Sequence, residues 1–263
     1  MGTEKLSIIT INLNNRNGLQ KTIDSVVSQT YRDFEWIIID GGSTDGSKDV
    51  IERYSEHIDY WVSEPDRGIY NAMNKGIRLS HGEYLHFLNS GDSFFDKNVL
   101  SNVIPLLAGK DYYVGDEMRN GCLMEQKIST SQQICDTMIK KWIPHQTVFT
   151  NRRIYDTYGM YREDKKIVSD WWLFFKSIII GDATVEKLPF TVDIFDTNGI
   201  SSNCQLDNIL AERQDFLSEL PRTRFLMDFY IYNYDILHAL KGNKIVFFIF
   251  RIYFWLYRRC SKK

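Results

Sequence analysis

The first hundred residues alternate between two hydrophobic periods. Short apolar runs, most of them rich in β-branched residues, predict buried strands at Leu6–Leu13, Phe34–Ile39, Ile58–Val62 and Glu83–Leu88. Between and after these strands, apolar residues three or four positions apart predict helices, including Ile69–Leu79 and Val99–Leu107. Strand and helix alternate four times, so the pattern predicts an α/β fold with a mainly parallel sheet covered on both faces.

Polar residues at the expected helix starts predict how the first two helices begin. Asn17 is expected to cap the helix that buries Leu19, Ile23 and Val26. Ser43 or Thr44 is expected to cap the next helix, which ends near Tyr54.

A polar segment follows each of the four predicted strands. These segments are Asn12–Asn15, Asp40–Asp45, Glu64–Gly68 and Asn89–Asp92. In open parallel sheets, ligands bind beyond the carboxyl ends of the strands. The sequence therefore predicts an active site where these four loops meet.

The pattern is looser after Lys110. Strands are predicted at Tyr112–Val114, Leu123–Lys127, Gln146–Thr150 and Thr184–Phe195, and helices at Asp170–Ile180 and Leu206–Leu220. No internal repeat or Pro-rich linker divides this stretch, so residues 1–220 are expected to form one domain and residues 221–263 a separate helical segment.

The second segment contains the run KIVFFIFRIYFWLYRR at residues 244–259. This run is shorter than the ~20 residues that span a bilayer, and Arg251 interrupts it. Bulky aromatic residues flanked by Lys and Arg predict an amphipathic helix lying in a membrane interface. The alternative is a helix that packs on the protein's own core or in a dimer.

Composition excludes several other classes of protein. A net charge of -2 gives no reason to expect a nucleic-acid partner. The four cysteines form no CxxC pair, which predicts free thiols in a reducing cytoplasm and neither a zinc site nor a disulfide framework. The N-terminal MGTEKLSIITINLNN has no basic start and only a short apolar run, unlike a signal peptide.

Two of the polar loops carry candidate chemistry. Asp40 opens the turn DGGSTDGS, where a carboxylate can accept hydrogen bonds from a base or ribose and glycines allow close approach of a ligand. A turn with a helix cap explains the other polar residues of that loop, but it does not explain Asp40. Asp92 ends the turn NSGD and can bind a hard cation, although these are also ordinary turn residues.

Two further positions of the Glu64–Gly76 stretch point to a ligand. Arg67 precedes a predicted helix, where its guanidinium and the helix N-terminus could both face an anion. Asn74, followed by Lys75 and Gly76, interrupts the apolar helix with polar groups that a pure core helix does not need.

At this point the chain resembles a known family. SIITINLNN, IIIDGGSTDGS, EPDRGIYNAMNKGI and YLHFLNSGD occur in an order and spacing similar to those of the family 2 glycosyltransferases. The resemblance covers about residues 5–200 and is strongest to the branch that builds bacterial O-antigen, capsule and colanic-acid-type polysaccharides. It implies a GT-A type, Rossmann-like sheet, with residues 1–110 as the nucleotide-binding half and 111–220 as the acceptor half.

The resemblance also implies roles for individual residues. Asp40 matches the residue that contacts the base, Asp92 the metal ligand and Asp170 the catalytic base, although Asp170 also suits a helix cap. The other positions matching donor-binding segments of the family are Ile11, Asn12, Asn14, Arg67, Asn74, Asn89, Ser90 and Gly91.

This chain departs from the family pattern at three positions. Asn89 and Gly91 stand where many relatives carry Asp, so Asp92 is expected to be a solitary carboxylate on the metal. Asn71 also stands where relatives often have Asp, which puts its role in doubt. His145, in a His-Gln pair that relatives share, is either a structural residue or a group near the diphosphate or acceptor.

Together these features predict a metal-dependent inverting glycosyltransferase on the cytoplasmic face of the membrane. The expected donor is a UDP-sugar, the cofactor Mg²⁺ or Mn²⁺, and the acceptor a saccharide or lipid-linked saccharide. The competing hypothesis is a degenerate, non-catalytic scaffold of a membrane assembly. The loop NLNNRNG lacks the Gly-rich turn that a nucleotidyltransferase or a Rossmann dehydrogenase needs after its first strand.

Overall fold

The computed structural model describes residues 4–140, 142–197, 199 and 205–219. The chain divides into two compact units, Met1–Ile209 and Leu210–Lys263. The C-terminal helical extension predicted over residues 221–263 lies outside the described residues. Within the described ranges, the helices are too short or too polar to cross a bilayer.

The first unit is built on one sheet, whose strands run in the order β3-β2-β1-β4-β8-β6-β9-β5, with β7 paired to β6. The strands are β1 (Leu6–Asn12), β2 (Glu35–Asp40), β3 (Tyr60–Ser63), β4 (Tyr84–Phe87), β5 (Ser93–Phe94), β6 (Tyr112–Arg119), β7 (Cys122–Met124), β8 (Val148–Asn151) and β9 (Val185–Phe195). The first four strands are parallel, which confirms the predicted α/β class. Beyond them the sheet is mixed, because β8 runs antiparallel to both β4 and β6.

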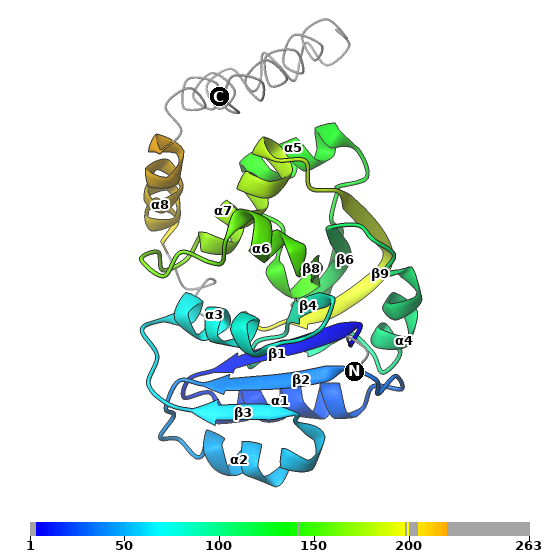
Figure 1. Cartoon of the computed structure of the whole chain (residues 1–263), viewed down its shortest axis with the longest axis vertical. Coiled ribbons are helices and arrows are strands. Elements are labelled where there is room, and N and C mark those ends of the chain that lie inside the picture. The colour runs from blue at the N-terminus through cyan, green and yellow to red at the C-terminus, as the bar shows by residue number, and fades with distance from the viewer. Residues whose placement is uncertain (1–3, 141, 198, 200–204, 220–263) are drawn as a thin grey trace, which may run out of the picture. The chain divides into compact units, whose positions relative to one another are not determined.

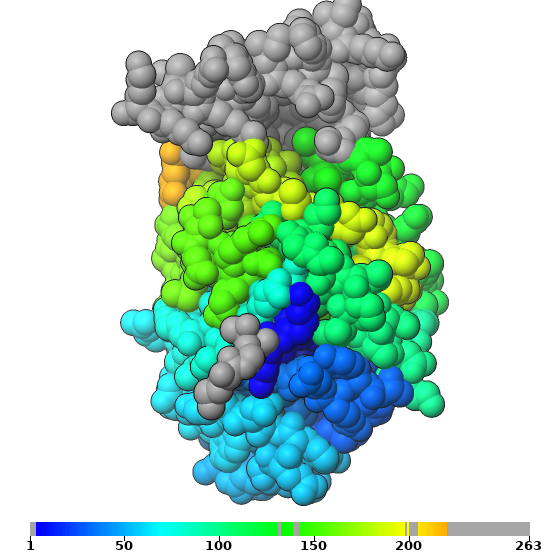
Figure 2. All heavy atoms as spheres, turned by 45° about the vertical axis from the view of Figure 1, so that its right-hand side comes forward, coloured from blue at the N-terminus to red at the C-terminus, as the bar shows by residue number. Residues whose placement is uncertain are grey.

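Helices cover both faces of the parallel half (Figure 1). The helices of the described residues are α1 (Arg16–Val27), α2 (Ser47–Arg53), α3 (Ile69–Leu79), α4 (Val99–Val103), α5 (Ser131–Lys140), α6 (Arg153–Tyr158), α7 (Ser169–Phe174) and α8 (Leu206–Ser218). A π-helix follows α7 at Phe175–Ile180, and short 3₁₀ turns occur at Ser55–His57, Ile104–Leu106 and His145–Thr147. In Figure 2, the dark-blue start of β1 lies at the boundary between the blue and cyan first hundred residues and the green segments after them.

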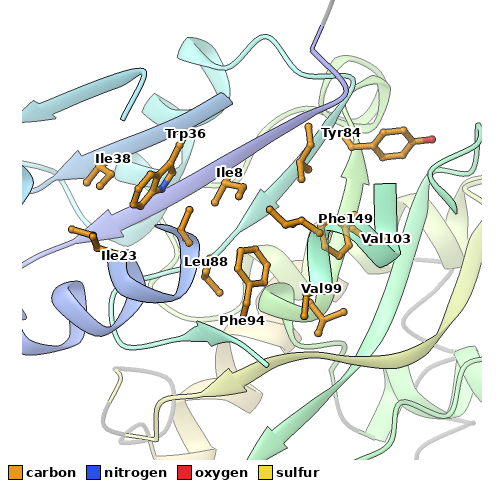
Figure 3. Packing of buried hydrophobic residues seen from close by; sticks show 14 of the residues in the cluster. Ile8, Ile23, Trp36, Ile38, Tyr84, Leu88, Phe94, Val99, Val103 and Phe149 are labelled. Carbon is orange, nitrogen blue, oxygen red and sulfur yellow. The ribbon is translucent and has the colours of Figure 1, made fainter. Parts of the chain in front are cut away.

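Strand β1 is buried over its whole length because helices pack on both of its faces. On one face, Leu6 and Ile8 join a core cluster with the apolar sides of α1, α2 and α4. Figure 3 shows Ile8, Leu88, Phe94 and Phe149 packed together within this cluster. On the other face, α3 approaches so closely that Gly76 lies directly against Ile9.

Several local predictions are wrong in detail. Asn15, not Asn17, caps α1 and accepts a hydrogen bond from the Gly18 amide (3.1 Å). Neither Ser43 nor Thr44 caps α2, which begins after Gly46 without a side-chain cap. The predicted helix Asp170–Ile180 divides into α7 and a π-helix. The pattern also missed α5, α6 and β5, which have two to ten residues each and offer little periodicity.

The Gly76–Ile9 contact yields a stability prediction. Gly76→Ala should lower the free energy of unfolding by about 1–3 kcal/mol, because the new Cβ would overlap Ile9 Cγ2. This loss runs against the higher helix propensity of Ala, which alone favours the variant by about 1 kcal/mol. Urea unfolding of both proteins measures the difference.

A double-mutant cycle identifies the cause of that loss. In an Ile9→Ala background the overlapping methyl group is absent, so Gly76→Ala should become neutral or stabilising. An equal cost of Gly76→Ala in both backgrounds would show that the overlap is not responsible.

Candidate active site

The first part of the site is the Asp40 carboxylate at the end of β2. Its Oδ1 accepts hydrogen bonds from Asn12 Nδ2 (2.7 Å) and Ser43 Oγ (2.6 Å). Its Oδ2 accepts from the Ser43 amide (2.9 Å) and Ser63 Oγ (2.6 Å). Burial works to raise the pKa of Asp40, but these hydrogen bonds hold the pKa below its ordinary value. All four acceptor positions of the Asp40 carboxylate are occupied. A nucleotide that binds here must therefore displace one of these four donors or contact the side chains that Asp40 holds in place.

Hydrogen bonds join the loops after the four parallel strands. The Asn14 amide donates to Ser43 Oγ (2.7 Å), and Asn14 Oδ1 accepts from the Thr44 amide (2.9 Å). The Ser90 amide donates to the Ile11 carbonyl (3.1 Å), and the Glu64 amide donates to the Asp40 carbonyl (3.0 Å). The loops therefore meet at one edge of the sheet, as the sequence predicted, while the role of this edge in binding stays a prediction.

The turn after β4 has no room for a side chain at position 91. Gly91 has a φ of 107°, in the region that favours glycine, and a Cβ there would overlap the Asp196 side chain. Its amide donates to Thr22 Oγ1 (3.0 Å), and its carbonyl accepts from Lys21 Nζ (2.8 Å). This crowding and the positive φ account for glycine at position 91.

Asp92, in the same turn, is a buried carboxyl group whose negative charge few neighbouring groups stabilise. Its side chain accepts a hydrogen bond from the Asp196 amide (2.8 Å). Burial, together with the nearby Asp196 carboxylate, raises the pKa of Asp92 to about 7, although the Asp196 amide, His145 and Lys21 oppose the rise. Without a cation, the group is therefore only partly ionised at neutral pH.

The residues of this turn fit one hard divalent cation. Asn89 Oδ1 is buried and has no hydrogen-bond partner among the described residues, and it lies in the same turn as the Asp92 carboxyl. Both groups offer oxygen atoms, which Mg²⁺ and Mn²⁺ prefer. Within the part of the chain that the structure describes, no three His, Cys, Asp or Glu side chains gather to hold a metal. The remaining ligands would have to come from the substrate or water.

His145 connects this turn to Asp170. Its Nε2 lies 2.9 Å from Asn89 Nδ2, and its Nδ1 lies 3.4 Å from Asp170 Oδ2. Burial works to lower the pKa of His145, but the carboxylates of Asp170, Asp92 and Glu117 raise it above its ordinary value.

Asp170 lies in the first turn of α7, but its side chain does not cap the helix. The N-cap residue is Val168, and no side-chain cap hydrogen bond is present there. Instead, Asp170 Oδ1 accepts a hydrogen bond from the Tyr70 hydroxyl (3.0 Å), and Oδ2 faces His145. The structure thus brings Asp170, His145, Asn89 and Asp92 into one polar cluster.

Asn74 does not belong to this cluster. Its Nδ2 donates to the Tyr161 carbonyl (2.9 Å) and to Glu163 Oε1 (3.0 Å), and its Oδ1 accepts from the Tyr161 amide (3.0 Å). To bind the donor, Asn74 would have to exchange one of these partners, and its role stays a prediction. Arg67 pairs with Glu163 (3.1 Å), so contact with an anion would require it to exchange that partner.

Sequence analysis missed Asp193, which lies on β9. Its side chain is fully buried, and neither carboxyl oxygen has a hydrogen-bond partner among the described residues. Burial and the carboxylates of Asp92 and Glu117 raise its pKa well above the ordinary value. A single Asp inside the apolar run VDIF was the only available signal.

Comparison with known proteins identifies the family. The sequence profile described as Glycosyl transferase family 2 matches residues 7–174, and the chain belongs to this family of glycosyltransferases. An uncharacterised glycosyltransferase of Mycobacterium tuberculosis is 32% identical over 212 residues, which cover 75% of this chain and 77% of the relative. A PGL/p-HBAD biosynthesis glycosyltransferase of Mycobacterium bovis is 26% identical and covers 84% of this chain and 86% of its own length.

Solved structures share the fold. S. aureus TarS 1–349 in complex with UDP-GlcNAc superposes with a TM-score of 0.64 at 15% identity over 77% of this chain. The mannosyltransferase PcManGT from Pyrobaculum calidifontis, in complex with GDP-Man and Mn²⁺, gives 0.58 at 19% identity over 73%. This chain spans between 36% and 62% of the length of the TarS chains and 56% of that of PcManGT. These matches confirm the GT-A type fold.

The raised pKa of Asp92 predicts that Asp92→Asn stabilises the metal-free protein. At high pH the ionised, buried carboxylate lowers the free energy of unfolding by an amount on the order of 4 kcal/mol, since the pKa rises from 3.8 to about 7 in the folded protein. At about pH 8, in a chelator, the variant should gain about 1–3 kcal/mol, less than the full cost because its amide also needs partners. Calorimetry measures this difference.

The pH dependence and the metal response provide the controls. Between about pH 4 and pH 7 the folded carboxyl retains a proton that the unfolded chain has lost, so wild-type stability falls as the pH rises and the advantage of the variant grows. Mn²⁺ should raise the melting temperature of the wild type but not of Asp92→Asn. A variant equally destabilised across this range would contradict the prediction.

Proposed function

We propose that this glycosyltransferase transfers a sugar from a nucleoside-diphosphate donor to an acceptor hydroxyl with inversion at the anomeric carbon. The observation that carries the proposal is the position of His145, which contacts Asn89 of the Asp92 turn through one ring nitrogen and Asp170 through the other. A cation-binding group and a candidate base are thereby held close together in one site, as a single displacement requires.

The proposed donor is a UDP-sugar bound at the edge where the loops after β1 to β4 meet. Residues 1–110 would form the nucleotide-binding half, with Asn12, Asn14 and the turn held by Asp40 facing the nucleoside. TarS and PcManGT support this donor class, since they were solved in complex with UDP-GlcNAc and with GDP-Man and Mn²⁺. Arg67 is proposed to exchange Glu163 for the diphosphate when the donor binds.

Asp92 and Asn89 would hold the divalent cation, Mg²⁺ or Mn²⁺. When bound, the cation supplies positive charge that neutralises the diphosphate as it leaves. The buried Asp92 carboxyl would become fully ionised beside such a cation, which removes the cost of its burial.

Asp170 is proposed to act as the general base. Its carboxylate takes the proton from the acceptor hydroxyl while the acceptor oxygen forms a bond to the anomeric carbon of the donor sugar. The bond between that carbon and the diphosphate oxygen breaks, and its electron pair leaves with the nucleoside diphosphate. One displacement of this kind inverts the anomeric configuration.

The acceptor is proposed to be a saccharide or lipid-linked saccharide bound by residues 111–220, during assembly of a bacterial surface polysaccharide. The M. bovis relative supports a glycan acceptor, because its name places it in PGL/p-HBAD biosynthesis. The resemblance to O-antigen, capsule and colanic-acid transferases supports the same class.

Asp170→Asn tests the proposed chemistry. Wild-type protein with Mn²⁺ should release nucleoside diphosphate from one of UDP-GlcNAc, UDP-galactose, UDP-glucose or GDP-mannose, with water as the acceptor. The variant should lose roughly 100-fold or more of this rate, because the amide cannot take a proton. Its donor dissociation constant, measured by calorimetry, should remain that of the wild type.

Asp156→Asn is the matched control, since Asp156 is exposed and lies in the first turn of the short helix α6. It should retain the wild-type rate. Loss of donor binding in Asp170→Asn would overturn the role of Asp170 as base. A wild-type protein that neither binds nor hydrolyses any donor would favour the non-catalytic scaffold.

We further propose that residues 244–259 hold the enzyme on the cytoplasmic face of the membrane. The support is the run KIVFFIFRIYFWLYRR, whose aromatic residues and basic flanks suit an anionic interface. Full-length protein should sediment with vesicles containing phosphatidylglycerol, and a chain truncated after Gly242 should remain in the supernatant. Binding by the truncated chain, or none by the full-length protein, would contradict the proposal.

A further inference from the structure

The Asp170 carboxylate is contacted at both of its oxygen atoms by side chains distant in sequence. The Tyr70 hydroxyl donates to Oδ1 at 3.0 Å, and His145 Nδ1 lies 3.4 Å from Oδ2. The contact with Tyr70 is the shorter one, and the Asp170 side chain is only 15% exposed. The orientation of this carboxylate therefore depends chiefly on Tyr70.

Tyr70 is well placed to fix an orientation because its own ring cannot move freely. It is the second residue of α3, it is buried, and its ring packs against that of Tyr161 with 5.5 Å between centroids. Its hydroxyl oxygen also accepts a hydrogen bond from the Ser169 amide at 3.0 Å. One hydroxyl group thus holds both the backbone of α7 at its first residue and the side chain of the next residue, Asp170.

This arrangement replaces the usual helix cap. The first amides of a helix have no partner within the helix, and a polar residue at the N-cap normally supplies one. Val168 occupies that position in α7 and cannot do so. Tyr70 supplies the acceptor from α3 instead, so removal of its hydroxyl affects the start of α7 and the Asp170 carboxylate together.

We propose that Tyr70 is the positioning residue of the catalytic base. This inference rests on the proposed role of Asp170. A base must be held at hydrogen-bond distance from the acceptor hydroxyl, and an aspartate that lost its donor could rotate about its side-chain bonds. The Tyr70 hydroxyl fixes the carboxylate and ties it to α3, which directly follows the loop after β3.

The Tyr70 hydroxyl remains a donor throughout the working pH range. Burial, together with the Asp170 carboxylate, raises the pKa of Tyr70 well above its ordinary value. The other titratable groups that act on Asp170 are His145 and the neighbouring Tyr161. Tyr70→Phe therefore removes one hydrogen-bond donor from the carboxylate and leaves the ring in place.

Tyr70→Phe should lower kcat/KM for donor hydrolysis by about 10- to 100-fold, because the carboxylate is no longer held in place. The probe is the nucleotide sugar that the wild type hydrolyses fastest among the four named above. The loss should appear in kcat, whereas the KM for the donor should not change, because Tyr70 is proposed to position the base and not to bind the donor. The donor dissociation constant should not change.

Tyr155→Phe is the matched control. Its buried hydroxyl lies 3.3 Å from the Tyr161 hydroxyl, and no contact joins it to Asp170 among the described residues. Both variants should remain folded, with one cooperative unfolding transition each, since each deletes one buried hydroxyl and keeps the ring. Only Tyr70→Phe should change kcat and kcat/KM.

Two results would overturn the inference. One is a Tyr70→Phe enzyme with the kcat and kcat/KM of the wild type, and the other is an equal loss in Tyr155→Phe. Asp170→Asn distinguishes this failure from that of the proposed function. If Asp170→Asn keeps its rate, Asp170 is not the base, whereas an inactive Asp170→Asn beside a normal Tyr70→Phe refutes only the role of Tyr70.

Discussion

The parallel register of β1, β2 and β3 determines where the polar groups of the candidate site lie. Asn12 pairs with Asp40 and Asp40 pairs with Ser63, so the three side chains that form the first corner of the site come from directly adjacent positions. Side chains alternate along a strand, and a slip of one residue would turn Asn12 away from Asp40. Burial of β1 between helices on both faces prevents that slip, because it would place different side chains against Gly76 and α1.

The carboxyl groups of Asp40, at the end of β2, and Asp92, in the turn after β4, have opposite energetics. Asp40 is buried, yet its pKa is below the ordinary value because four hydrogen bonds stabilise the anion. Asp92 is also buried, and its pKa rises to about 7 because a backbone amide and more distant charges compensate it only in part. Asp40 therefore strengthens the fold as it stands, whereas Asp92 strengthens it only after a positive charge arrives.

The sequence predicted best what local periodicity encodes. Helix α3 was predicted with its observed bounds, Ile69–Leu79, and the four parallel strands were located within about two residues, the usual uncertainty of element ends. The partners of Asp170 could not be predicted in this way. Tyr70 is separated from Asp170 by 100 residues, and no spacing along the chain relates them. Asp193 was missed for the same reason, because its importance comes from Asp92 and Glu117 on other strands.

The stability lost by burying two carboxyl groups also bears on whether the chain is an enzyme or an inactive scaffold. Asp92 and Asp193 are both buried, and each carries a carboxyl group that costs stability in the metal-free fold. A scaffold has no need of either group and would be more stable with apolar or amide side chains there. Groups whose pKa values are displaced by burial and by one another are concentrated at functional sites, where the lost stability serves binding or catalysis. The Asp170 carboxylate, held by Tyr70 beside His145, lies in the same cluster as Asp92, where the proposed cation would offset the cost of burying that carboxyl group.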